Sequence, residues 1–219
     1  MKRNAKKSAQ GFSRALSAPE IEHLLSHVQA KADAARRSAG SRAVVDELIV
    51  LLLLETGLRP RELCGLEIRH TQRPHGLEVP AGRNTRHIPL PQRSAKAIRR
   101  YVEVFRRNVG PKAPLILTER GTPLGYISIY NKVQRIGKEA GILDLQPMTL
   151  RRTFMVRLFN KEKDLRLVQQ QAGHASPKTT ARQVRTTCDC CQRVINRDEI
   201  TRIDSGQVLC GECLKELRP

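Results

Sequence analysis

One apolar run constrains the fold of this chain more than any other feature. The segment VVDELIVLLLLETG, residues 44–57, contains the uninterrupted run IVLLLL at 49–54. Such a run is far too short to cross a bilayer, which needs about 20 apolar residues. It predicts a strongly apolar helix that ends at Gly57, because glycine commonly caps helix C-termini.

Helical spacing and turn residues predict a mostly helical domain around that segment. A capping box at 17–20 opens a helix, which SAGS at 38–41 breaks. Residues 77–91 read as two short strands joined by a Gly-Arg-Asn turn. The other expected elements are a short helix from 59, a helix over 92–107, an extended piece at 115–118, and helices near 125–140, 148–161, 163–172 and 178–185. The expected fold class is mainly α with one small antiparallel hairpin.

The charge balance indicates a polyanionic partner. The 219 residues include 40 Lys+Arg against 21 Asp+Glu, a formal net charge of +19. With no Trp and four Phe, the chain is poorly equipped for a membrane-surface helix or a base-stacking platform for single strands. We therefore expect double-stranded DNA as the partner, no membrane contact, and a cytoplasmic, nucleoid-associated protein. Residues 1–16 read as a basic disordered arm.

Five short motifs carry a resemblance to a known family. They are LSAPEIEHLL from 16, TGLRPRELCGL from 56, RHIPLP from 86, LQPMTLRRTF from 145 and DLRLVQQQAGHASPKTT from 164. Their order and spacing resemble the catalytic domain of the tyrosine recombinases, the family of phage integrases and chromosome-dimer resolvases. The resemblance covers residues from about 16 to 186, so it includes only that domain.

The resemblance assigns roles to several residues. Arg59 and Arg151 take the places of the two arginines that hold the scissile phosphate, His174 takes that of the third box, and Glu62 supports the fold. The alternative is that these arginines are merely ion-paired, Arg59 with Glu62, and that His174 is a packing residue. The candidate DNA phosphate-binding residues are Arg59, Arg83, Arg86, Arg151, Arg152 and His174.

Three positions depart from the family pattern. The nucleophilic tyrosine normally lies nine residues after the histidine, where this chain has Gln183, and an amide cannot replace a phenolate. The chain's tyrosines are all far upstream, at Tyr101, Tyr126 and Tyr130. Arg83 stands nearest to the place of the hairpin lysine, and Met148 replaces the second-box histidine. These departures predict a protein that binds DNA and is not an enzyme.

The carboxy-terminal cysteines form a second pattern. Two C-x-x-C pairs, separated by 18 residues, predict one structural zinc ion. The expected ligands are Cys188, Cys191, Cys210 and Cys213, with Cys190 as a competitor for the place of Cys191. A finger of this size has too little core to fold without metal.

Together these observations predict three parts: the arm at 1–16, a DNA-binding domain at 17–186 and a zinc domain at 187–219. The expected function is that of a transcriptional regulator or an architectural recombination factor. One alternative is an active recombinase with an unorthodox nucleophile. Another is a module that docks a protein through its finger; a second copy of the chain on DNA is a further expected partner.

Overall fold

The structure is a computed structural model of the chain. It describes residues 14–37, 41–73, 76–81 and 84–184, together with four residue pairs nearer the C-terminus at 186–187, 194–195, 201–202 and 208–209.

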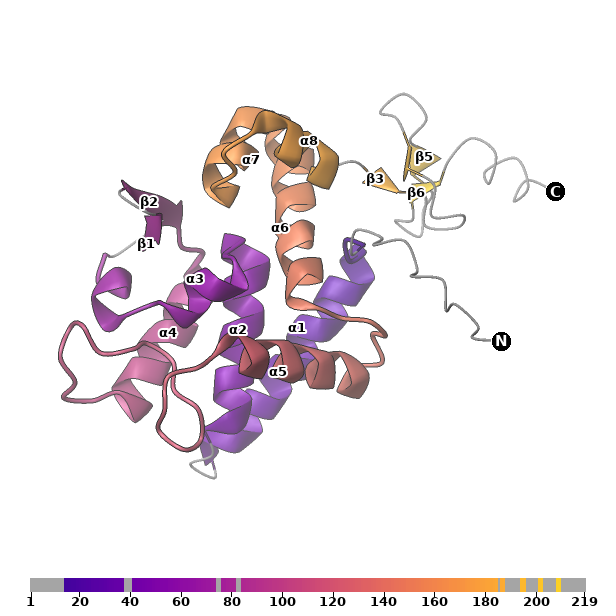
Figure 1. Cartoon of the computed structure of the whole chain (residues 1–219). Helices are drawn as coiled ribbons and strands as arrows, with labels where there is room; N and C mark the ends of the chain where they lie inside the picture. The colour runs from indigo at the N-terminus through magenta and orange to yellow at the C-terminus, as the bar shows by residue number, and fades with distance from the viewer. Residues whose placement is uncertain are drawn as a thin grey trace, which may run out of the picture.

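The described chain is mainly helical, with one hairpin between its third and fourth α-helices (Figure 1). In order, the elements are α1 (Ala18–Arg37), α2 (Arg42–Thr56), α3 (Pro60–Cys64), the 3₁₀ helix η1 (Ile68–Thr71), β1 (Gly76–Ala81), β2 (Asn84–Pro89), α4 (Gln92–Phe105), α5 (Tyr126–Glu139), α6 (Pro147–Glu162), α7 (Leu165–Ala172) and α8 (Pro177–Val184). The predicted fold class, mainly α with a small antiparallel sheet, is confirmed.

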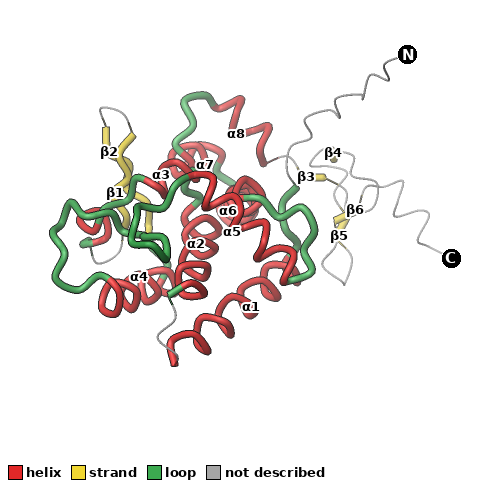
Figure 2. The backbone as a smooth tube through the Cα atoms, turned by 60° about the horizontal axis from the view of Figure 1, so that its bottom comes forward, coloured by secondary structure: helices red, strands yellow, loops and turns green. Residues whose placement is uncertain are grey.

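Helix α2 is the centre of the molecule. Helices α1, α4, α5 and α6 all pack against it, as two views of the chain show (Figures 1 and 2). Every residue from 44 to 54 is buried, which explains why the helix is apolar on all sides. Among the described residues, no helix is long and apolar enough to cross a membrane.

The hairpin places one face against the core. Strands β1 and β2 pair antiparallel, with Leu77 opposite Ile88 and Val79 opposite Arg86. All four of these side chains are buried, whereas Thr85 and His87 between them are exposed. The period-2 alternation of a half-buried strand therefore directs Arg86 inward.

Helices α6, α7 and α8 form a smaller second core. Met155, Val168, Ala172 and Val184 are buried together there. Figure 1 shows α6 running from the main body toward α7 and α8, so this helix joins the two cores.

Two regions add detail to the sequence expectations. Residues 115–118 form an extended piece whose only bridge joins Leu117 to Pro123. Near the C-terminus, β3 (Thr186–Thr187) pairs with β4 (Val194–Ile195), and β5 (Thr201–Arg202) pairs with β6 (Val208–Leu209). The four predicted zinc ligands lie outside the described residues.

Replacing Gly57 tests the turn at the end of α2. Its φ is 62°, and a Cβ there would overlap the Phe154 ring. Gly57→Ala should therefore lower the free energy of unfolding by about 2–5 kcal/mol, from backbone strain plus overpacking. Urea denaturation measures this change.

Gly121→Ala is the matched control, because Gly121 has φ 77° but open space around its Cβ position. It should cost only about 1 kcal/mol, the backbone part alone. Equal losses in the two variants would contradict the role given to the Phe154 contact.

Candidate phosphate-binding site

Arg151, on α6, is the most deeply buried basic side chain of the site, with 1% of its surface exposed. Its guanidinium donates to the carbonyl of Gly57 at the end of α2 and to that of Ala172, 2.7 Å away at the end of α7. It also lies 3.1 Å from Nε2 of His174. One cation thus ties together three segments that are far apart in sequence.

Arg59 and Arg86 share one carboxylate. Glu62 accepts from the Arg59 backbone N–H at 2.7 Å and from its guanidinium at 3.2 Å. Both terminal nitrogens of Arg86 donate to the two Glu62 oxygens, at 3.0 and 2.9 Å. The remaining terminal nitrogen of Arg59 donates to the carbonyl of Gly173. Arg59 is the outermost cation, because 44% of its side chain is exposed against 8% for Arg86.

The Gly173-His174 turn closes the site. Gly173 caps α7 with φ 64°, a conformation that favours glycine. A Cβ at this position would overlap the guanidinium of Arg86. Position 173 therefore requires glycine for two reasons: its backbone angle favours glycine, and any larger side chain would collide with Arg86.

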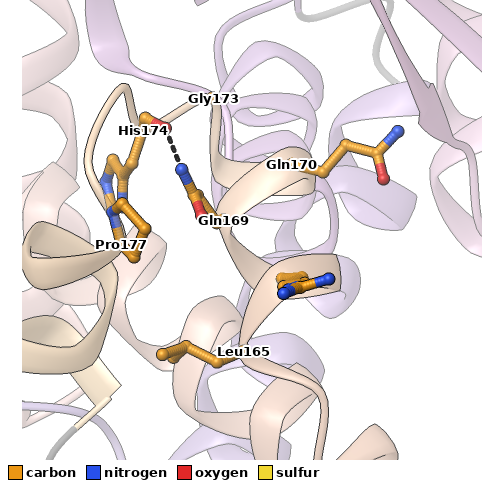
Figure 3. A pocket seen from close by; sticks show the side chains of 7 residues that line it. Leu165, Gln169, Gln170, Gly173, His174 and Pro177 are labelled. Atoms are coloured by element: carbon orange, nitrogen blue, oxygen red, sulfur yellow. Dashed lines mark hydrogen bonds between the residues drawn. The ribbon is translucent and has the colours of Figure 1, made fainter.

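His174 is held from three sides. Its Nε2 faces Arg151, its Nδ1 lies 3.0 Å from Oγ1 of Thr180 on α8, and its carbonyl accepts from Gln169 at 3.1 Å. Figure 3 shows the Gln169 contact at the edge of a pocket of about 680 Å³. That pocket is lined by Leu165, Arg166, Gln169, Gln170, Gly173, His174 and Pro177.

The site carries an excess of positive charge. Three guanidinium groups, those of Arg59, Arg86 and Arg151, lie around it, and Glu62 is the carboxylate that Arg59 and Arg86 contact. Burial, followed by the charges of Arg59 and Arg86, lowers the pKa of Arg151 to about 10. Burial, followed by the charges of Arg151, Arg59 and Arg86, lowers the pKa of His174 to about 4. His174 is therefore neutral at pH 7, and an anion would relieve the repulsion among the arginines.

The other predicted residues lie elsewhere. Arg152 points away from the cluster: it is buried, and its Nε donates to the carbonyl of Gln183 at 3.0 Å. Met148 is 37% exposed near the start of α6. Gln183 lies on α8, and Arg83 falls outside the described residues. Of the tyrosines, Tyr101 is buried in the main core.

The sequence reasoning missed two contributors, Thr180 and Gln169. The Thr-rich segment and the glutamine run gave a weak signal, because neither shows which hydroxyl or amide faces the histidine. Among the described residues, no group of three or more His, Cys, Asp or Glu side chains could hold a metal.

Comparisons with known proteins place this geometry in context. A family model described as the phage integrase family matches residues 14–187. Tyrosine recombinase XerC of Thermodesulfovibrio yellowstonii is 29% identical over 144 residues, which cover 62% of this chain and 48% of the relative. The chain thus spans about half the length of that relative.

Solved structures share the fold. A crystal structure of XerA recombinase superposes with a TM-score of 0.68 at 24% identity, covering 95% of this chain and 67% of that one. The XerH site-specific recombinase bound to its difH substrate gives 0.65 at 22% identity, covering 77% and 49%.

These relatives correct one expectation. The prediction that the chain is not an enzyme is wrong, because the proteins it resembles are named recombinases. The prediction weighed the missing tyrosine and the changes at Arg83 and Met148, although the elements that hold the candidate phosphate-binding residues Arg59, Arg151 and His174 are present. Since the family model matches most of its length, the chain belongs to the phage integrase family of tyrosine recombinases.

Proposed function

We propose that this chain works in site-specific DNA recombination by binding a phosphate of duplex DNA and activating it for strand transfer. The observation that supports this most directly is the convergence of Arg59, Arg86 and Arg151 on the Gly173-His174 turn, where Glu62 pairs with Arg59 and Arg86. The net charge of +19 favours the same polyanion. The DNA-bound XerH structure provides a precedent for this fold on duplex DNA.

Each arginine would have a distinct part. Arg59 is exposed enough to leave the Gly173 carbonyl and donate to a phosphate oxygen. Arg151 is fixed by two carbonyls and contributes a preorganised charge, which is the kind that stabilises negative charge developing in a transition state. Arg86 acts through Glu62, whose carboxylate it orients.

Strand transfer also needs a nucleophile. A hydroxyl oxygen forms a bond to phosphorus while a DNA oxygen leaves and takes up a proton. Gln183 cannot supply that oxygen, and a second copy of the chain would have the same residue. We therefore place the nucleophile at another hydroxyl of this chain, outside position 183.

Arg59→Gln tests the phosphate contact. It removes one exposed cation, so DNA affinity should fall about tenfold or more, and the salt dependence should lose about one phosphate contact. Titration of a labelled duplex at several salt concentrations measures both quantities.

Arg120→Gln is the matched control, since Arg120 is an exposed arginine in the loop between α4 and α5. Equal losses in the two variants would reduce the assignment to general charge. Arg151→Ala is a poor test, because two carbonyls would lose their partner in a buried place.

A nicked trap duplex tests strand transfer. The full chain is incubated with it alone and together with an active tyrosine recombinase, and adducts that survive denaturation are analysed by mass spectrometry. We expect an adduct on this chain that is lost with Arg59→Gln, and the modified residue identifies the nucleophile. Adducts that form only on the added recombinase would overturn the proposal.

Regulation of transcription is a second proposal. It rests on the strong positive charge and on DNA binding, neither of which requires strand cleavage. Sequencing of fragments captured by the full chain would support it if a few sites beside promoters are recovered. Uniform recovery of all fragments would contradict it.

We also propose one structural zinc ion for the C-terminal segment. Two observations support it. The first is the paired C-x-x-C spacing. The second is that β3 and β6 are in contact, and Cys188 is the next residue after β3, as Cys210 is after β6. This finger could add DNA contacts or dock a protein partner.

Elemental analysis of the purified chain should find one zinc per molecule. Cys210→Ser should reduce that content and lower the melting temperature of the C-terminal segment, while Cys64→Ser should keep the zinc. Cys64 lies on α3 and is partly buried against the main core. Full zinc content after Cys210→Ser would exclude the predicted ligand set.

A further inference from the structure

The contacts of His174 define where its proton lies. Arg151 can only donate, so its approach to Nε2 at 3.1 Å requires a lone pair on that nitrogen. A neutral imidazole has one N–H, which must then be on Nδ1. The group facing Nδ1 is the Thr180 hydroxyl, 3.0 Å away, whose oxygen accepts a hydrogen bond from this N–H.

This arrangement makes His174 an acceptor toward the site. A phosphate needs donors, so the ring would have to present an N–H at Nε2 once DNA is bound. The Arg151 donor then turns from Nε2 to the phosphate, and Nε2 takes up a proton from water. Nδ1 either keeps its own proton, which leaves the ring cationic, or releases it to water. Thr180 suits both forms, because a hydroxyl can accept from Nδ1–H and can also donate to a bare Nδ1.

Thr180 is well placed for this role. It lies on α8 with no exposed surface, so water cannot substitute for its hydroxyl. The charged groups nearest to the ring are Arg59, Arg86, Arg151 and Glu62, and none of these contacts Nδ1.

We infer that Thr180 is a positioning residue that, together with the Arg151 contact at Nε2, fixes the proton of His174 on Nδ1 in the free protein, and that it supports protonation of Nε2 when a phosphate binds and takes over the Arg151 donor. The first half of this inference rests on geometry alone. The second half rests on the proposed function, because it assigns the phosphate to this site.

Nitrogen NMR of the imidazole rings tests the first half in the full chain without DNA. The His174 signals, assigned by their loss in His174→Gln, should show a protonated Nδ1 and an unprotonated Nε2. Thr180→Val keeps the shape but leaves Nδ1–H without an acceptor, while Arg151 still donates to Nε2. The proton should therefore stay on Nδ1, and the Nδ1–H signal should shift upfield because its hydrogen bond is lost. Thr180→Ser should restore the original signal. A proton on Nε2 in the wild type, or an unchanged Nδ1–H signal in Thr180→Val, would overturn the inference.

Duplex affinity tests the second half. Thr180→Val should bind about fivefold more weakly, the effect of one hydrogen bond, and Thr180→Ser should recover. Thr179→Val is the matched control, because the neighbouring Thr179 is only partly buried and is not in contact with His174. Wild-type affinity in Thr180→Val would overturn this half.

Failure of the proposed function and failure of the role given to Thr180 can be distinguished. If the NMR pattern is as expected but the wild type does not bind duplex DNA, the tautomer assignment stands and the proposed function fails. If the wild type binds DNA and Thr180→Val changes neither the ring nor the affinity, the proposed function stands and the role of Thr180 is rejected.

Discussion

A buried guanidinium organises this molecule. Removing a cation from water costs several kcal/mol unless it is well hydrogen-bonded, and Arg151 is almost completely buried. Its partners are carbonyls at the ends of α2 and α7, together with the His174 ring. These groups satisfy its donors but carry no formal negative charge. The ends of α2 and α7 must therefore stay beside α6. The polar contacts of Arg151 thus fix the position of one hydrophobic core relative to the other.

The same contacts leave the site incomplete in electrostatic terms. Burial, and after it the charges of Arg59 and Arg86, lower the pKa of Arg151, because the three cations repel one another across a partly buried space. Glu62 offsets part of this repulsion but is already shared by two arginines. Stability given up in this way is expected where a fold prepares to bind something, and an anion restores the balance. The close placement of the three cations thus explains both why the site is preorganised and why it would prefer an anion.

Sequence alone predicted the parts of this arrangement that depend on local pattern. The apolar run marked α2, and Gly57 marked its end because few other residues adopt that backbone angle. The places of Arg59, Arg151 and His174 came from the family resemblance. The direction in which each side chain points could not be predicted. Arg151 and Arg152 are adjacent, yet a helix turns about 100° per residue, so one reaches the cluster and the other reaches α8. The Thr180 contact depends on how α8 packs, which no local pattern encodes.

Position 183 shows how the fold and the chemistry separate. Arg152 holds this position through the backbone carbonyl, a group that every residue has. The placement of α8 therefore depends little on which side chain stands at 183, and Gln183 occupies the position without disturbing the helix. By contrast, the proposed phosphate-binding groups act through side chains, and that of Arg151 also joins the ends of α2 and α7, so it is costly to lose. A chain of this fold can change its nucleophile far more easily than its phosphate site, and the phosphate site is the better guide to its function.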